Sequence, residues 1–296
     1  MHRRLHITVA IAIAISAAVA ANATATQLPG QVSTNWAGYA AITGASTRAF
    51  AKHFTTASGS WVQPSATCIP GQPSFSAFWV GLGGYRQSSQ SLEQVGTEAD
   101  CSAAGVISYY AWYEYVPDGP HTIRAIPVSP GDAITATVHV RGEHATVSVT
   151  DTTTGATFAH TKSMRSPRPA VGAAEWIAEA PSNCNRGNCM PLTLTDFGSV
   201  SFTNATATAV GVNGAHTGVI DDPAWTYDAI NLQANAGGFR FGHELRSAAT
   251  VGALAVTGDA FSVTYAGGAQ PAGSSPTGST GSSGSSGSSG STGATG

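Results

Sequence analysis

Val171-Gly-Ala-Ala-Glu-Trp-Ile-Ala-Glu-Ala-Pro181 is a short apolar stretch that nevertheless contains two carboxylates. Its length predicts a β-strand, in which side chains alternate, so Glu175 and Glu179 share one face while Trp176 and Ala178 share the other. A carboxylate among buried neighbours must be paired, hydrogen-bonded or functional, because burying an unpartnered charge is costly. The alternative is an edge strand with one solvated face. The remainder of the chain decides between the two interpretations.

The rest of the chain follows a similar pattern of short strands separated by turns. Apolar and polar residues alternate over 134–140 and again over 145–149, which predicts a hairpin. An aromatic segment at 109–116 ends at the turn Pro117-Asp-Gly-Pro120. No stretch has the period of an amphipathic helix of useful length, so we predict an all-β, antiparallel sandwich or barrel. Further strands are predicted at 58–64, 77–82, 92–98, 200–203, 229–233 and 261–265.

The two ends of the chain differ from the middle. Residues 1–25 resemble a secretory signal peptide, since Arg3 and Arg4 precede an apolar run shorter than the roughly 20 residues that span a bilayer. Residues 26–34 are expected to be a short leader and 35–266 a single domain. The Gly-, Ser- and Thr-rich residues 267–296 cannot form a core and are expected to be a tail or linker. We therefore expect a secreted protein with no membrane attachment after the signal is removed.

The charge content is low, with 10% charged residues and a formal net charge of -3. So little positive charge argues against a nucleic-acid partner. A fold with few ion pairs also offers acid few salt bridges to break, which predicts tolerance of low pH.

The four cysteines fit an oxidising compartment. Cys184 and Cys189 flank Asn-Arg-Gly-Asn and are expected to close a small loop, which leaves Cys68 and Cys101 for a second disulfide. Three pairings are possible from the sequence alone. No Cys/His spacing is typical of a metal ligand set, so no metal site is expected.

Two further predicted strands carry polar side chains on a single face. In one strand Gln94 and Glu98 share a face, and in the other Trp112 and Glu114 do. Beside Val171–Pro181 in one sheet, these strands would form a polar groove over an apolar core. We expect the strand of Gln94 to lie next to that of Glu179.

Seven short motifs follow one another in a particular order: Asn35-Trp-Ala-Gly, Ser58-Gly-Ser-Trp-Val-Gln-Pro64, Phe78-Trp-Val-Gly-Leu-Gly-Gly84, Leu92-Glu-Gln-Val-Gly96, Tyr110-Ala-Trp-Tyr-Glu-Tyr115, Ala174-Glu-Trp-Ile-Ala-Glu179 and Thr195-Asp-Phe-Gly-Ser-Val-Ser-Phe202. In this order they resemble the glutamic peptidases, the eqolisin family, over about Asn35 to Tyr265. The resemblance implies a sandwich of two bent antiparallel sheets, of the concanavalin A-like or jelly-roll type. It also implies a secreted, acid-acting endopeptidase of protein or peptide substrates, with no metal or cofactor, and we expect a monomer.

The resemblance assigns the catalytic glutamine to Gln94 and the catalytic glutamate to Glu179. It places Trp36 and Trp79 along the site and gives Glu114 the position of a supporting carboxylate.

The other polar residues of the predicted faces, Glu98, Trp112 and Glu175, are expected to line or frame the groove. The fungal members of the family have Asp where this chain has Gly83. Glu98 or Glu114 is therefore expected to orient the reacting groups instead.

Amide hydrolysis needs an activated water, a donor for the oxyanion and a proton for the leaving nitrogen. The hypothesis is that ionised Glu179 takes a proton from water, Gln94 donates an N–H to the oxyanion, and Glu179 then protonates the departing amine. Since Gln94 does not titrate, one carboxylate serves both steps, and activity is expected only in acid.

Two alternatives remain open at this stage. A jelly-roll glycoside hydrolase would use two facing carboxylates about 5 Å apart, a part that Glu114 and Glu179 can play. Glu175 and Glu179 cannot, because four residues of strand separate them by roughly 13 Å. A lectin-like surface module displayed on the tail would bind without turnover.

Overall fold

The computed structural model describes residues 24–43, 51–86, 88–185, 188–211, 214–236 and 244–267. Within these ranges the chain forms β-strands and no α-helix, in agreement with the expected all-β class. The described residues accordingly include no helix of a length and apolarity suited to crossing a membrane. The expected signal peptide lies outside the described residues except for its last two positions, and the expected tail lies outside them after Gly267.

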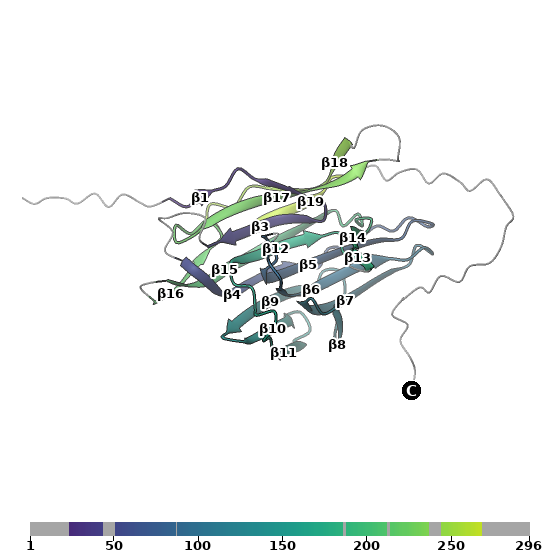
Figure 1. Ribbon diagram of the computed structural model, residues 1–296. Coiled ribbons are helices and arrows are strands. Elements are labelled where there is room, and N and C mark those ends of the chain that lie inside the picture. The colour runs from purple at the N-terminus through teal and green to yellow at the C-terminus, as the bar shows by residue number, and fades with distance from the viewer. Residues whose placement is uncertain are drawn as a thin grey trace, which may run out of the picture.

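One layer of the structure contains seven antiparallel strands in the spatial order β8, β7, β6, β5, β12, β3, β17 (Figure 1). Their bounds are His121–Pro127 for β8, Ile107–Val116 for β7, Leu92–Cys101 for β6, Ser74–Gly83 for β5, Ala173–Glu179 for β12, Trp36–Ile42 for β3 and Thr226–Ala236 for β17. The residues expected to be a leader belong to this layer too. They form β1 (Thr26–Gln27) and β2 (Gln31–Ser33), which pair in parallel with β17.

The second layer has the order β11, β10, β9, β4, β15, and β15 also pairs with β16 and β19. The bounds are Thr157–Ser163 for β11, His144–Asp151 for β10, Ala133–Arg141 for β9, Ala51–Val62 for β4, Ser199–Gly211 for β15, Gly214–Val219 for β16 and Phe261–Tyr265 for β19. β18 (Glu244–Val251) pairs with both β17 and β19 and so joins the layers along one edge. β13 (Ser182–Asn185) and β14 (Asn188–Pro191) form a separate hairpin.

β6 and β12 are not neighbours, contrary to the expectation from the sequence. β5 lies between them and pairs with both, so that Trp79 stands opposite Ile177 on one side and Gly96 on the other. The physical reason is that β5 and β6 are consecutive strands joined by a short connection, which favours their pairing in a hairpin. The other edge of β5 is left for β12.

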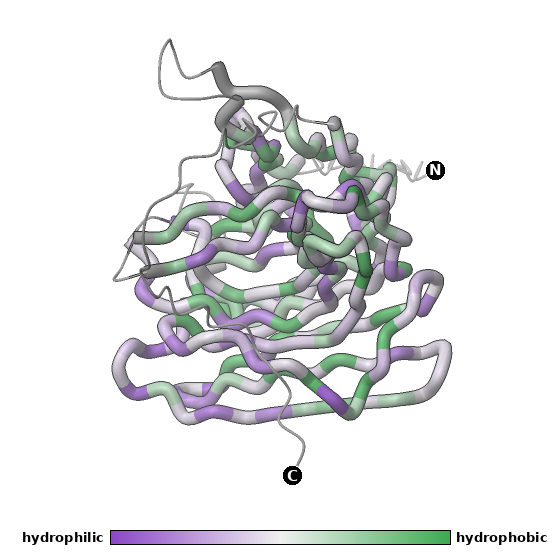
Figure 2. The backbone as a smooth tube through the Cα atoms, turned by 90° about the vertical axis from the view of Figure 1, so that its right-hand side faces the viewer, coloured by the Kyte–Doolittle hydropathy of each residue, from purple (hydrophilic) through white to green (hydrophobic). Residues whose placement is uncertain are grey.

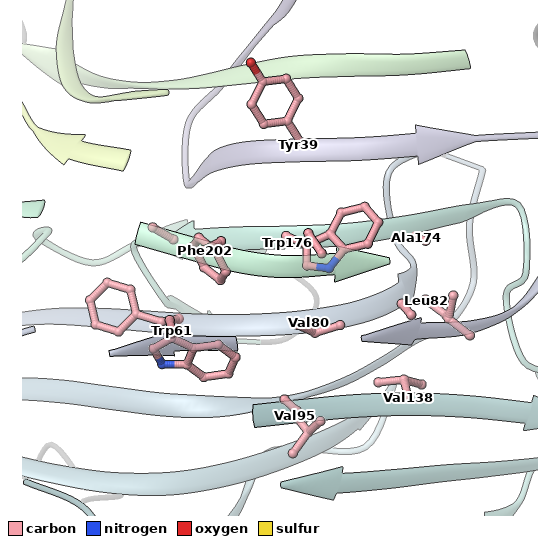
Figure 3. Close-up of a cluster of buried hydrophobic side chains, with 14 of the residues drawn as sticks. Tyr39, Trp61, Val80, Leu82, Val95, Val138, Ala174, Trp176 and Phe202 are labelled. Atoms are coloured by element: carbon pink, nitrogen blue, oxygen red, sulfur yellow. The ribbon is translucent and has the colours of Figure 1, made fainter. Parts of the chain in front are cut away.

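Apolar side chains from both layers meet in one large core (Figure 3). Trp176 and Ala178 point into it, as the alternation in β12 predicts, and the Trp176 indole donates to the Ser58 carbonyl over 2.8 Å. Trp61, Phe202 and Trp176 are at most 2% exposed. Burying each such side chain contributes about 2–3 kcal/mol, so this core holds the two layers together.

Polar and apolar residues alternate along the strands, as the changing colours in Figure 2 show. On the outward face of the second layer, serine and threonine hydroxyls pair across strands, as Ser58 does with Thr137 and Ser60 with Thr135, both over 2.9 Å. Such pairs do not titrate, which suits the low charge content of the chain.

Candidate active site

The face of the first layer that points away from the core, called the groove face below, carries the predicted site residues. The strand register arranges them in three rows. Because paired residues share a face, each row runs straight across the strands β12, β5, β6 and β7. The rows are Glu179, Ala77, Glu98, Tyr110; then Ile177, Trp79, Gly96, Trp112; then Glu175, Gly81, Gln94, Glu114.

A cavity of about 270 Å³ opens on the groove face. Five of the predicted residues line it: Gln94, Glu98, Trp112, Glu114 and Glu179. Ala77, which lies between Glu179 and Glu98 in their row, and Tyr110, at the end of that row, line it too, and Pro120, Thr122, Pro181 and Ser182 form other parts of its wall. A larger hollow of about 550 Å³ on the second layer is lined by Ser, Thr, Asn and apolar residues. Its lining has no titratable side chain, whereas four line the smaller cavity: Glu98, Tyr110, Glu114 and Glu179.

Glu179, the last residue of β12, is held by a hydrogen bond to each of its oxygens. The Trp79 indole donates to Oε2 over 2.7 Å, and the Asn35 side-chain amide donates to Oε1 over 3.0 Å. Burial raises the pKa of Glu179 to about 7, while the donors Trp79, Trp36 and Asn35 act to lower it and the nearby Glu114 carboxylate acts to raise it. The result is a fixed carboxyl that can exchange a proton near neutral pH.

Gln94 and Glu114 form a direct pair across β6 and β7. Gln94 Nε2 donates to Glu114 Oε2 over 2.6 Å, whereas Gln94 Oε1 is buried without a partner. Burial raises the pKa of Glu114, and the Gln94 hydrogen bond partly offsets this. In this contact a carboxyl oxygen of Glu114 accepts from the nitrogen of the amide, which sets how the Gln94 amide is turned.

Glu98 belongs to a second group of acids beside the cavity. The Tyr110 hydroxyl donates to Asp100 over 2.8 Å. Burial raises the pKa of Glu98 well above its usual range, and the charges of Asp100 and Glu179 raise it further. In acid Glu98 is therefore a neutral carboxylic acid that can donate a hydrogen bond.

Trp36, Trp79 and Glu175 do not line the cavity. Trp79 contacts Glu179 instead, and Trp36 packs edge-on against Trp79 with ring centroids 5.1 Å apart. The Trp79 ring lies over Gly81 of the same strand. A Cβ on Gly81 would lie 2.8 Å from that ring, so glycine is needed at this position.

Glu175 of β12 stands opposite Gly81 in the pairing with β5 and is fully buried. Neither of its carboxyl oxygens has a hydrogen-bond partner. Burial raises the pKa of Glu175 well above its usual range, and the charge of Glu93 raises it further. Glu175 therefore lies in the buried floor and does not frame the opening, contrary to the expectation from the sequence.

Gly83 has a backbone that would not accept the aspartate of the fungal family members. Its φ is +92°, and a Cβ there would lie 2.3 Å from the Ala170 Cβ and 2.8 Å from the Ser91 carbonyl oxygen. Of the two acids that the sequence offers as orienting groups, Glu114 is hydrogen-bonded to Gln94.

Asn35 is a site residue that the sequence did not single out beyond its place in a motif. It lies 144 residues before Glu179, in the turn between β2 and β3. Neither periodicity nor charge patterning indicates a contact of such sequence separation.

The two disulfides join Cys68 to Cys101 and Cys184 to Cys189. The first ties the end of β6 to the segment before β5, and the second closes the β13–β14 hairpin, whose Ser182 lines the cavity. Across the described residues, no three or more His, Cys, Asp or Glu side chains are grouped so as to hold a metal ion.

Known proteins resemble this chain in sequence and in fold. The model of the Peptidase A4 family matches residues 34–236. Aspergillopepsin-2 from Aspergillus niger is 31% identical over 201 residues, which cover 61% of this chain and 66% of that protein, just under two thirds of its length. The crystal structure of scytalido-glutamic peptidase with a transition state analog inhibitor has a TM-score of 0.60 and 21% identity, over 78% of this chain and 98% of that one.

A second solved structure, the eqolisin SCP-B in complex with a tripeptide, covers the same shares of the two chains with a TM-score of 0.52 and 21% identity. At this identity the solved structures establish the shared β-sandwich fold, and the family match establishes descent. The chain therefore belongs to the Peptidase A4 family, the glutamic peptidases or eqolisins.

Proposed function

We propose that this protein is a secreted, acid-acting endopeptidase in which Gln94 and Glu179 hydrolyse peptide bonds. The observation that carries the proposal is the cavity that both side chains line, in which Glu179 is held by two N–H donors and Gln94 by Glu114. Family membership supports peptide bonds as the substrate. The two disulfides and the signal-like residues 1–25 support export.

The reaction proceeds in two steps. Ionised Glu179 removes a proton from a water molecule as the water oxygen bonds to the scissile carbonyl carbon, and the carbonyl oxygen becomes an oxyanion. An N–H of Gln94 donates to this oxyanion, a contact worth about 3 kcal/mol in comparable sites. Protonated Glu179 then gives its proton to the nitrogen, the C–N bond breaks, and Glu179 returns to its ionised form.

Glu114 and the two indoles prepare the groups for these steps. The carboxyl of Glu114 keeps the nitrogen of Gln94 in a defined position before substrate arrives, which limits reorganisation during the reaction. Trp79 holds one oxygen of Glu179, a residue that lines the cavity.

Acid action follows from three carboxyls in one small cavity. Burial raises the pKa of Glu98, Glu114 and Glu179 alike. In acid Glu98 and Glu114 are neutral, so the ionised fraction of Glu179, which is small below its pKa of about 7, meets no like charge in the cavity. As the pH rises, Glu98 and Glu114 ionise as well. The repulsion between like charges then disfavours the close arrangement of the three carboxyls and the binding of substrate between them.

The test is cleavage of denatured casein from pH 3 to pH 7, with and without pepstatin. Wild type is expected to cleave in acid and to resist pepstatin, and Glu179→Gln and Gln94→Ala, shown to be folded by circular dichroism, are expected to be inactive. Glu143→Gln is the matched control, since Glu143 lies on the surface and pairs with Arg165 and Arg168. Casein cleavage by folded Glu179→Gln at the wild-type rate would refute the proposal.

A polysaccharide panel belongs in the same experiment, because Glu114 and Glu179 line one cavity and a glycoside hydrolase would also use two carboxylates. Turnover of a polysaccharide that survives Gln94→Ala, without casein cleavage, would replace the peptidase proposal by that alternative.

A further inference from the structure

Ser33, the last residue of β2, organises the turn that leads into β3. Its Oγ donates to the Asn35 side-chain oxygen over 3.0 Å and accepts from the backbone N–H groups of Asn35, over 3.3 Å, and Trp36, over 3.1 Å. One hydroxyl therefore fixes the backbone of the turn and the rotation of the Asn35 amide. With its oxygen engaged by Ser33, this amide presents its nitrogen on the opposite side.

The Asn35 nitrogen meets the carboxyl of Glu179. Nδ2 donates to Glu179 Oε1 over 3.0 Å, and the carbonyl oxygen of Asn35 accepts from the backbone N–H of Ala180 over 2.8 Å. Asn35 thus holds both the side chain of Glu179 and the backbone of the residue after it.

The same turn reaches the other oxygen of Glu179 through two indoles. The backbone N–H of Trp36 donates to Ser33, and the Trp36 indole packs edge-on against Trp79 at an interplanar angle of 77°. Trp79 in turn donates to Glu179 Oε2 over 2.7 Å. Both oxygens of the carboxyl therefore depend on a turn that begins at Ser33.

We propose that Asn35, oriented by Ser33, is a positioning residue for Glu179, whose carboxyl it aims into the cavity and whose ionised form it stabilises. The leader strand β2 is by this route a working part of the site. The inference rests on the proposed role of Glu179 as the proton-transferring group, but the contact itself can be tested without measuring catalysis.

Other titratable groups also face Glu179 and contribute to its ionisation. Glu98 on β6 and Glu114 on β7 interact with it electrostatically, and Tyr110 stands in the same row. β3 and β5 contribute Trp36, Trp79 and Ala77, which do not titrate. Asn35→Leu and the variants of Ser33 leave all of these unchanged and add no charge, so a change in the pKa of Glu179 in them reports the loss of the Asn35 contact.

The indole N–H of Trp79 provides the readout, because its ¹H–¹⁵N signal changes when the carboxylate that it contacts gains a proton. The signal is assigned by its loss in Trp79→Phe, and its titration is attributed to Glu179 if Glu179→Gln abolishes it. The variants compared are Asn35→Leu, Asn35→Asp, Ser33→Ala and Ser33→Thr. Ser201→Ala is the matched control, since Ser201 pairs with the hydroxyl of Ser262 on the second layer, away from the groove face.

In Asn35→Leu the midpoint of the Trp79 titration is expected to rise by about one pH unit, because an N–H donor to the ionised carboxylate is gone. In Asn35→Asp, which keeps the shape of the residue, it rises further because two carboxyls share the site. Ser33→Ala gives a smaller rise, and Ser33→Thr, which keeps the hydroxyl, restores the wild-type midpoint. In acid, kcat of Asn35→Leu falls about tenfold with KM little changed, following the smaller ionised fraction of Glu179.

An unchanged midpoint in both folded Asn35 variants would overturn the inference, as would a shift of equal size in Ser201→Ala. These outcomes are separate from failure of the proposed function. If Glu179→Gln remains active, the catalytic assignment is wrong, while the Trp79 titration still decides whether Asn35 controls the carboxyl.

Discussion

Glu93 provides a prediction about stability that can be worked out from its surroundings. It lies on β6 with the core-facing residues, its side chain is 0% exposed, and neither carboxyl oxygen has a hydrogen-bond partner. Burial raises its pKa from 4.5 to about 8, and the polar groups of Ser91 and Ala170 offset only part of this effect. The folded protein therefore retains a proton that the unfolded chain releases near pH 4.5.

Because the folded state binds the extra proton, the free energy of unfolding falls as the pH rises from about 4.5 to 8. Between pH 4 and pH 7 the loss from Glu93 alone is about 3 kcal/mol. Glu175, whose pKa is also raised by burial, adds to it in the same direction. A domain is typically stable by about 5–15 kcal/mol, so the effect is a substantial part of the whole.

Glu93→Gln keeps the size of the side chain and removes the titration. We expect this variant to resemble wild type at pH 4 and to be more stable by about 3 kcal/mol at pH 7. Urea denaturation followed by tryptophan fluorescence at both pH values measures the difference as a shift in midpoint. Glu143→Gln, a surface replacement, serves as the control and should show the wild-type loss.

The reasoning is refuted if wild type has the same urea midpoint at pH 4 and pH 7. It is refuted equally if Glu93→Gln gains nothing at pH 7, since the variant removes the proposed source of the loss.

Two further predictions concern the surroundings of Gln94. Gly83→Asp, although it installs the fungal residue, is expected to lower the free energy of unfolding by more than about 2 kcal/mol, because its Cβ would clash with Ala170. Thermal melts measure the loss. They should show a much smaller one for Gly131→Asp, where φ is +93° but an added Cβ has no atom within 4 Å. Glu114→Leu removes the acceptor that holds Gln94 and should lower kcat about tenfold with little change in KM. Glu114→Gln keeps an acceptor, so its kcat should fall less. Equal peptide-cleavage rates in the two variants would contradict this.

The alternation of side chains along single strands was enough to predict which residues share a face. Glu179 and Trp176 do lie on opposite faces of β12, and Gln94 and Val95 lie on opposite faces of β6. The reason is that the period of a strand is set by local geometry. The all-β class followed in the same way from short alternating segments. These predictions needed no knowledge of which strands pair.

Properties that depend on pairing were not predictable in this way. Contacts between distant segments place β5 between β6 and β12. They also bury Glu175 next to Gly81, over which the Trp79 ring lies. The same holds for Asn35, whose partner is 144 residues away. A strand pattern states which way a side chain points, but its neighbours come from the order of strands in the sheet.

The pairing of β2 with β17 also governs when the site can be completed during synthesis. β2 is among the first described strands, yet its partner begins only at Thr226, and the Gly30 amide binds the side chain of Asp228, 198 residues later, over 3.0 Å. Contacts of such separation form late in folding. The turn that supports Glu179 is therefore anchored only after most of the chain has been made. A nascent chain therefore lacks a fully supported Glu179 until β17 has been made.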